Sequence, residues 1–148
     1  MRNQEVMREW VDRLRSGQYK QGTGRLRVED HYCCLGVLCE IAAERGIIGS
    51  PAPFGSTPLV TIKNGDFHSE DRTVYRYDGQ AHMPSRQVYE WAGIPAVGLT
   101  LTAKSLADLN DFAVPFAQIA DTIEQHWIDP IDIPDTPATI AEEELVNA

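Results

Sequence analysis

The chain has 148 residues, of which 43% are hydrophobic and 24% charged, and its net charge at pH 7 is -9. This length suits one domain that buries a core without disulfide or metal support. The apolar runs are far shorter than the ~20 residues that cross a bilayer, and the start of the chain lacks the apolar stretch of a secretory signal. We therefore expect a cytoplasmic protein with no membrane partner.

Charge is unevenly distributed along the chain. Residues 1–27 hold seven bases and three acids, a net charge of +4, whereas residues 129–148 hold six acids and no base. The pI of about 4.8 is far from the basic character that phosphate neutralisation needs, so no duplex DNA binding is expected. The prolines and acids of residues 129–148 predict an extended acidic tail after a single domain of residues 1–128.

Hydrophobic periodicity predicts the helices. They cover residues 3–16, 32–45, 84–92, about 106–111 and 115–127. The helix at 32–45 is apolar on most sides, which predicts a central and nearly buried position. Gly36 within it lowers helix propensity, and close packing against another backbone is the expected reason.

Alternation and turn signals predict a small antiparallel sheet. Strands are expected at residues 24–28, 59–62, 73–77 and 80–83. Asn64-Gly65 and Asp78-Gly79 are typical of hairpin turns, and the prolines of residues 49–58 predict an irregular loop. Alternation places Tyr75 and Tyr77 on one face and Arg76 on the other. The fold class is α+β: a single small domain of about four helices around this sheet, followed by the acidic tail.

Three cysteines, Cys33, Cys34 and Cys39, lie within seven residues. An odd number in so short a stretch cannot form a disulfide framework, so reduced thiols are expected. Adjacent side chains on a helix point about 100° apart, which disfavours a zinc site completed by His31. We expect buried small hydrophobic side chains, with a metal site or a reactive thiol as alternatives, and predict no metal and no cofactor.

The polar stretch of residues 19–27 combines cations, an aromatic side chain and glycines before a strand. Such a loop is suited to holding a phosphate or a carboxylate. With a second cation on the sheet, the predicted binding residues are Tyr19, Lys20, Gln21, Arg25, Arg27 and Arg76. The alternative is a solvated turn whose arginines pair with Asp12, Glu29 or the acidic tail.

Strong enzymatic motifs are absent from the sequence: it has no Gly-rich phosphate loop, no Gly-x-Ser-x-Gly and no His-Glu-x-x-His. A cysteine nucleophile would need a base, and no pattern places any of the four histidines beside one. This favours a binding protein. An enzyme acting on a nucleotide through Cys33 or His82 remains an alternative.

Several segments, in the order LRSGQYKQGTGRLR, YCCLGVLCEIA, YEWAGI, SLADLNDF and FAQIADTIEQHW, span about residues 12–127. This combination resembles a family of small uncharacterised proteins of tailed bacteriophages, especially phages of actinobacteria. The chain departs from that pattern at Val114-Pro115 and in its acidic tail.

The resemblance implies a non-virion accessory protein that binds and neutralises a host component in the host cytoplasm. The partner would be a defence or regulatory protein, or a small anionic or nucleotide signal. An acidic decoy for a basic host protein is a further alternative, since an acidic tail can mimic nucleic acid. Helix faces alone leave a homo-oligomer open.

Overall fold

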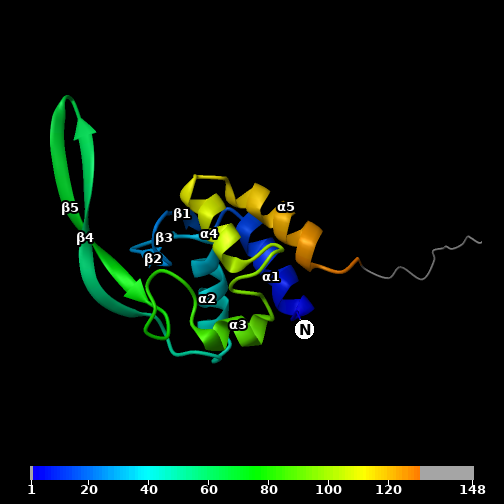
Figure 1. Cartoon of the computed structure of the whole chain (residues 1–148). Coiled ribbons are helices and arrows are strands. Elements are labelled where there is room, and N and C mark those ends of the chain that lie inside the picture. Colours follow the sequence, from blue (N-terminus) through cyan, green and yellow to red (C-terminus); the bar gives the residue numbers. More distant parts are fainter. Residues whose placement is uncertain (1, 131–148) are drawn as a thin grey trace, which may run out of the picture.

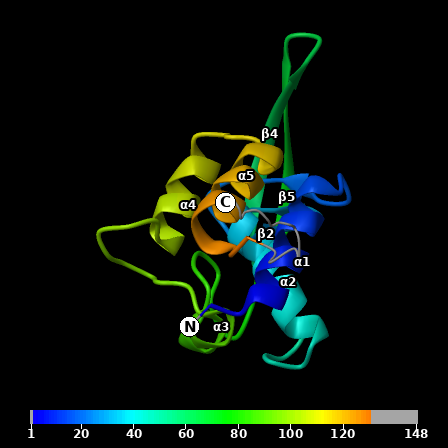
Figure 2. The same cartoon turned by 90° about the vertical axis from the view of Figure 1, so that its right-hand side faces the viewer.

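The computed structural model describes residues 2–130, which form one α+β domain with a projecting hairpin (Figures 1 and 2). The elements are α1 (Gln4–Arg15), β1 (Lys20–Gln21), β2 (Arg27–Val28), β3 (His31–Tyr32), α2 (Cys34–Glu44), β4 (Ala52–Lys63), β5 (Asp66–Arg76), α3 (Arg86–Ala92), α4 (Ala103–Asp111) and α5 (Phe116–Trp127). The described part thus holds five helices, one in each of the five predicted ranges, although the expected fold had only about four around the sheet. Most of the predicted acidic tail, residues 131–148, lies outside the described residues.

The core is built around α2, as the sequence predicts. All three cysteines are buried and unpaired, in agreement with their expected role as small apolar side chains. The α1 helix packs on α5, where the rings of Trp10 and Trp127 stack with centroids 6.3 Å apart. The Trp10 indole nitrogen donates a hydrogen bond of 2.9 Å to the carbonyl oxygen of Cys34, so α1 is fixed to the start of α2.

Gly36 packs closely against backbone outside α2, which confirms the sequence prediction. A Cβ atom at this position would lie 1.9 Å from the carbonyl oxygen of Leu26. Leu26 is itself buried, its N–H donates to Ala81, and its carbonyl accepts from the N–H of Cys33. The chain just before β2 is therefore held tightly against the first turn of α2.

The sheet is mixed rather than antiparallel, with the strand order β1-β3-β2-β5-β4. β1 pairs with β3 in parallel, and the other pairs are antiparallel. The short strand predicted at 24–28 is reduced to Arg27–Val28, because Leu26 turns into the core.

The prediction of an irregular loop at 49–58 is wrong over residues 52–58, which belong to β4. The prolines there suggested a break, but β4 is an edge strand, where a missing N–H leaves no ladder bond unmade. The turn at Asn64-Gly65 is confirmed, with φ of 53° and 83°. Asp78-Gly79 also turns, yet the predicted return strand at 80–83 is reduced to a single bridge between Tyr77 and Gln80.

Helix ends follow local signals closely. Gly93 ends α3 in the left-handed conformation, and Thr102 with Ser105 forms a capping box that starts α4 three residues before the predicted position. Pro115 precedes α5 as expected. Among residues 2–130, no helix has the length and apolar character that crossing a membrane requires.

Candidate functional site

The polar loop Gln21–Arg25 is fixed in place by α4. The Gln21 side-chain amide donates to the Asn110 side-chain oxygen at 3.1 Å and to a backbone carbonyl beyond α4 at 2.7 Å. Asn110 in turn donates to the carbonyl oxygen of Gly22 at 2.7 Å, and Asp111 accepts from the N–H of Gly24 at 2.9 Å. Gln21 therefore holds the loop through internal hydrogen bonds.

Asn110 is a residue that the sequence reasoning missed. It is completely buried, and its side-chain oxygen also accepts from the N–H of Cys34 at the start of α2. A buried polar group needs such partners, because an unmade hydrogen bond in the core is costly. The available signal was an asparagine four residues after Leu106, on the apolar face of a predicted helix.

Most bases of the N-terminal region make contacts within the protein, with acids on the same or other elements, with a backbone carbonyl or with an aromatic ring. The pairs and contacts are Arg13 with Glu9 and Glu44, Arg15 with Asp121 and Glu124, Lys20 with Asp30, Arg8 with the carbonyl of Asp129, and Arg2 over the ring of Trp127. The hydrogen bond from Arg13 lowers the pKa of Glu44, and the one from Lys20 lowers the pKa of Asp30. The +4 charge is thus not a bare cationic surface.

Arg27 and Tyr19 meet at the ring of Tyr32. The Arg27 guanidinium carbon lies 5.2 Å from the Tyr32 ring centroid and 4.0 Å from that of Tyr75, its neighbours on the adjacent strands. Tyr19 makes an edge contact with Tyr32 at 5.1 Å, and its hydroxyl accepts from Arg13. Arg27 is therefore held within an aromatic cluster.

Arg76 lies away from that cluster. Its guanidinium carbon is 3.2 Å from the ring centroid of Phe54, across the base of the hairpin. The structure thus brings Tyr19 and Arg27 together, turns Gln21 inward, and separates Arg76 from the loop. The part that these residues play in binding stays a prediction.

Arg25 differs from the other bases of residues 2–27. Within the described residues 2–130 it is half-buried, yet it has no hydrogen-bond acceptor, no acidic partner and no cation–π contact. Arg2 also lacks an acceptor and an acid there, but its guanidinium lies over the Trp127 ring. Arg25 lines two cavities, one on each side of the loop. A cation held by a fixed loop between two cavities is the feature of this surface best suited to an anionic ligand.

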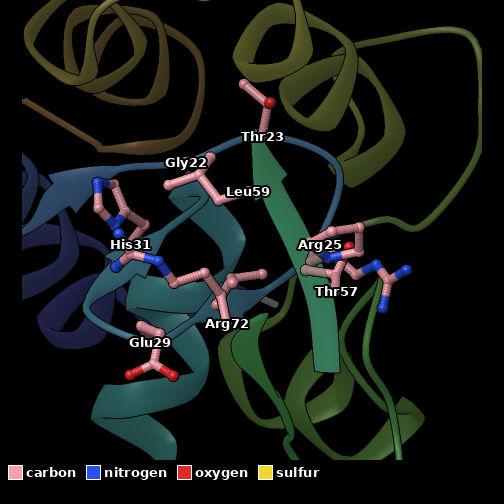
Figure 3. Close-up of a pocket in the computed structure, with 10 residues that line it drawn as sticks. Gly22, Thr23, Arg25, Glu29, His31, Thr57, Leu59 and Arg72 are labelled. Carbon is pink, nitrogen blue, oxygen red and sulfur yellow. The ribbon is translucent and has the colours of Figure 1, made fainter. Parts of the chain in front are cut away.

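The first of these, the hairpin cavity, has a volume of about 280 Å³ and lies between the loop and the base of the hairpin (Figure 3). It is lined by Gly22, Thr23, Arg25, Val28, Glu29, His31, Thr57, Pro58, Leu59 and Arg72. Arg72 reaches toward His31, while the Arg25 guanidinium points away from both. Arg72 is paired with Glu70 at 2.9 Å, so the cations of this cavity do not converge on one point.

The second, the helix cavity, has a volume of about 430 Å³ and lies between the loop, α4 and the segment before α4. It is lined by Gly24, Arg25, Cys33, His82, Met83, Tyr89, Ala96, Val97, Lys104, Ala107, Asp108 and Asp111. Apolar and aromatic walls with a few polar groups are typical of small-molecule sites, and the volume falls within their range.

Cys33 and His82 both line the helix cavity. They are the two residues named above for the catalytic alternative. The Cys33 sulfur accepts from the N–H of Gly36 at 3.3 Å and so caps α2. Burial raises the pKa of the Cys33 thiol to about 11, which leaves little of the nucleophilic thiolate at neutral pH. Across residues 2–130, no group of three or more metal-binding side chains comes together.

Comparison with known proteins gives one finding. The model of a family described as a domain of unknown function (DUF8296) matches residues 1–127. No curated protein and no solved structure matches the chain. Because the match covers most of the sequence, the chain belongs to this family.

Proposed function

We propose, from the geometry of the loop, that the chain is a binding protein whose helix cavity takes a small ligand with an anionic group. The observation that carries the proposal is Arg25, which is half-buried, held by a fixed loop and without a partner in the described residues. A guanidinium offers paired N–H donors that match a phosphate or a carboxylate. Lys104 also lines this cavity, but it is paired with Asp108 at 3.2 Å, so Arg25 is the cation available to a ligand.

The rest of the cavity defines the remainder of the ligand. Met83, Tyr89 and Val97 provide an apolar wall suited to a ring or a short hydrocarbon portion. The loop is ordered by Asn110 and Asp111 before any ligand arrives. Little conformational entropy is then lost on binding, which favours affinity.

The biological setting that we propose is bacteriophage infection, on the basis of the sequence resemblance described above. In that setting the protein binds and neutralises a host component in the host cytoplasm. A concave site with a single unpaired cation favours a small anionic signal, such as a nucleotide, over a host protein as the ligand of this site.

Native mass spectrometry of the full chain recovered from a host-cell lysate tests this function. We expect the wild-type chain to carry an added mass that is lost from the Arg25→Ala variant. Charged hydrogen bonds contribute about 1.5–3 kcal/mol, so affinity for the identified ligand should fall ~10–100-fold. Arg86→Ala is the matched control, since Arg86 is exposed, pairs with Glu90 and lines neither cavity. An added mass that survives Arg25→Ala would contradict the proposal.

Lys20→Ala separates the cavity site from the wider loop predicted by the sequence. Lys20 is exposed and paired with Asp30, so its loss should leave the added mass in place. A loss equal to that of Arg25→Ala would instead favour a site spread over residues 19–27.

A nucleotide-converting enzyme is the second candidate, because Cys33 and His82 line the same cavity. Its test is an assay of turnover on a panel of nucleotides. Turnover should be seen with the wild-type chain and should disappear in the Cys33→Ser and His82→Asn variants. The raised pKa of Cys33 disfavours it. The acidic decoy is tested separately by deleting residues 129–148. If the shortened chain binds the host component as well as the full chain does, the decoy is excluded.

A further inference from the structure

The outer part of the hairpin is a two-stranded ribbon that extends away from the body (Figures 1 and 2). β4 and β5 pair from Thr57↔Arg72 to Lys63↔Asp66. β2 pairs with β5 at Val74 and Tyr75, below this part. A two-stranded hairpin is at best marginally stable in water unless a helix or a further strand covers it.

The ribbon has two chemically different faces, because residues paired across the strands point to the same side. One face, here called the apolar face, carries Pro58, Val60, Ile62 and Phe67, together with Ser69 and Asp71 toward its base. Val60, Ile62 and Phe67 are 57%, 65% and 77% exposed. The opposite face carries Thr57, Leu59, Thr61, Lys63, Asp66, His68, Glu70 and Arg72. The apolar face is thus arranged like a core-facing sheet surface, yet it is open to solvent in the isolated chain.

We infer that the apolar face is covered by the same face of a second copy of this chain, so that two ribbons pack face to face. The first argument is charge. Residues 52–76 hold three bases and three acids, a net charge of zero, on a chain whose net charge is -9. Two copies repel each other least through this segment, and the charged faces of both ribbons stay in solvent.

The second argument concerns the way the ribbons meet. Pro53 and Pro58 lie on β4, the edge strand of the sheet, and prolines there oppose the addition of another strand. Association along the β4 edge is therefore disfavoured, whereas no proline opposes packing through the apolar face at Val60, Ile62 and Phe67. Asp71 is the one acid on the apolar face, and it lies at the base of that face, paired across the strands with Pro58.

The third argument is area. Val60, Ile62 and Phe67 leave on the order of 400 Å² of apolar surface open per copy, so two ribbons bury about 800–1,000 Å² with their flanking residues. This is at the lower limit for a specific interface. The dimer should therefore be weak and dependent on concentration, with a Kd in the micromolar range.

Sedimentation velocity of the full chain over a concentration series tests the inference. We expect a monomer at low micromolar concentration and a dimer at several hundred micromolar. The variant Val60→Thr, Ile62→Thr, Phe67→Thr keeps β propensity but removes the apolar face, and it should stay monomeric throughout. The matched control, Thr61→Ser with His68→Thr, changes a cross-strand pair on the opposite face and should dimerise like wild type.

A second measurement keeps the test valid if the triple variant loses its fold. Amide hydrogen exchange of wild-type residues 57–72 should slow as concentration rises, while exchange in the helices stays constant. A wild-type chain that is monomeric at every concentration, or a triple variant that still dimerises, would overturn the inference. Because Val60, Ile62 and Phe67 line neither of the cavities that Arg25 lines, the Arg25→Ala variant should dimerise normally, and the two proposals fail independently.

Discussion

Replacement of Gly36 by alanine tests how the loop is attached to the core. Alanine normally stabilises a helix interior by about 1 kcal/mol relative to glycine. Here the new Cβ would lie 1.9 Å from the Leu26 carbonyl oxygen, a backbone atom that cannot rotate away. Relief requires a shift of about 1 Å in α2 or in the segment that carries Leu26, and overpacking of this kind costs about 1–3 kcal/mol or more.

The expected net effect of Gly36→Ala is a loss of about 2 kcal/mol in the free energy of unfolding, or roughly 6–8 °C in Tm for a domain of this size. Urea and thermal unfolding measure it. Gly49→Ala is the control, because its Cβ would meet nothing within 4 Å, and it should be neutral or slightly stabilising. A Gly36→Ala variant as stable as wild type would refute the reasoning. Because Leu26 adjoins Arg25, the Gly36→Ala variant should also bind the ligand more weakly than wild type.

Two further predictions concern Tyr77 and Arg27. The buried Tyr77 hydroxyl donates to Glu40 at 2.6 Å, and burial followed by this hydrogen bond raises the pKa of Tyr77. A raised folded-state pKa gives stability that is present below the unfolded value of ~10 and is lost as pH rises above it. Tyr77→Phe should therefore cost about 1–2 kcal/mol at pH 7 and flatten this alkaline loss, as measured by urea unfolding from neutral to alkaline pH. If both chains lose stability equally with pH, the assignment fails. Arg27→Lys keeps the charge but loses the stack on Tyr75 and the hydrogen bond to the Glu29 carbonyl. The free energy of unfolding should therefore fall by about 1 kcal/mol. Unchanged stability would contradict the stacked geometry.

Local rules succeeded where the structure depends on neighbouring residues. The spacing of apolar residues predicted α5, and the pair Asn64-Gly65 predicted a turn that needs positive φ at both positions. Gly36 also predicted a close backbone contact, although not that Leu26 makes it. In each case a short stretch of sequence carries the physical cause.

Prediction failed where distant parts of the chain decide the outcome. The prolines of β4 are tolerated because the strand lies at a sheet edge, and sheet order is not a local property. The basic loop looked uniformly available, but Arg15 pairs with acids on α5, more than a hundred residues later. Arg25 was included among the predicted binding residues, yet what sets it apart is the lack of such a partner in the described chain.

Arg25 and the helix cavity form one ligand site in the function that we propose. An NMR titration of the isotope-labelled full chain with a small-molecule extract of host cells tests this site, with the arginine Nε–Hε signals and the backbone amides observed. We expect the Arg25 side-chain signal to shift together with the amides of Gly24, Met83 and Val97, and the Arg86 signal to stay unchanged. An unmoved Arg25 signal, or shifts confined to residues outside the helix cavity, would contradict it.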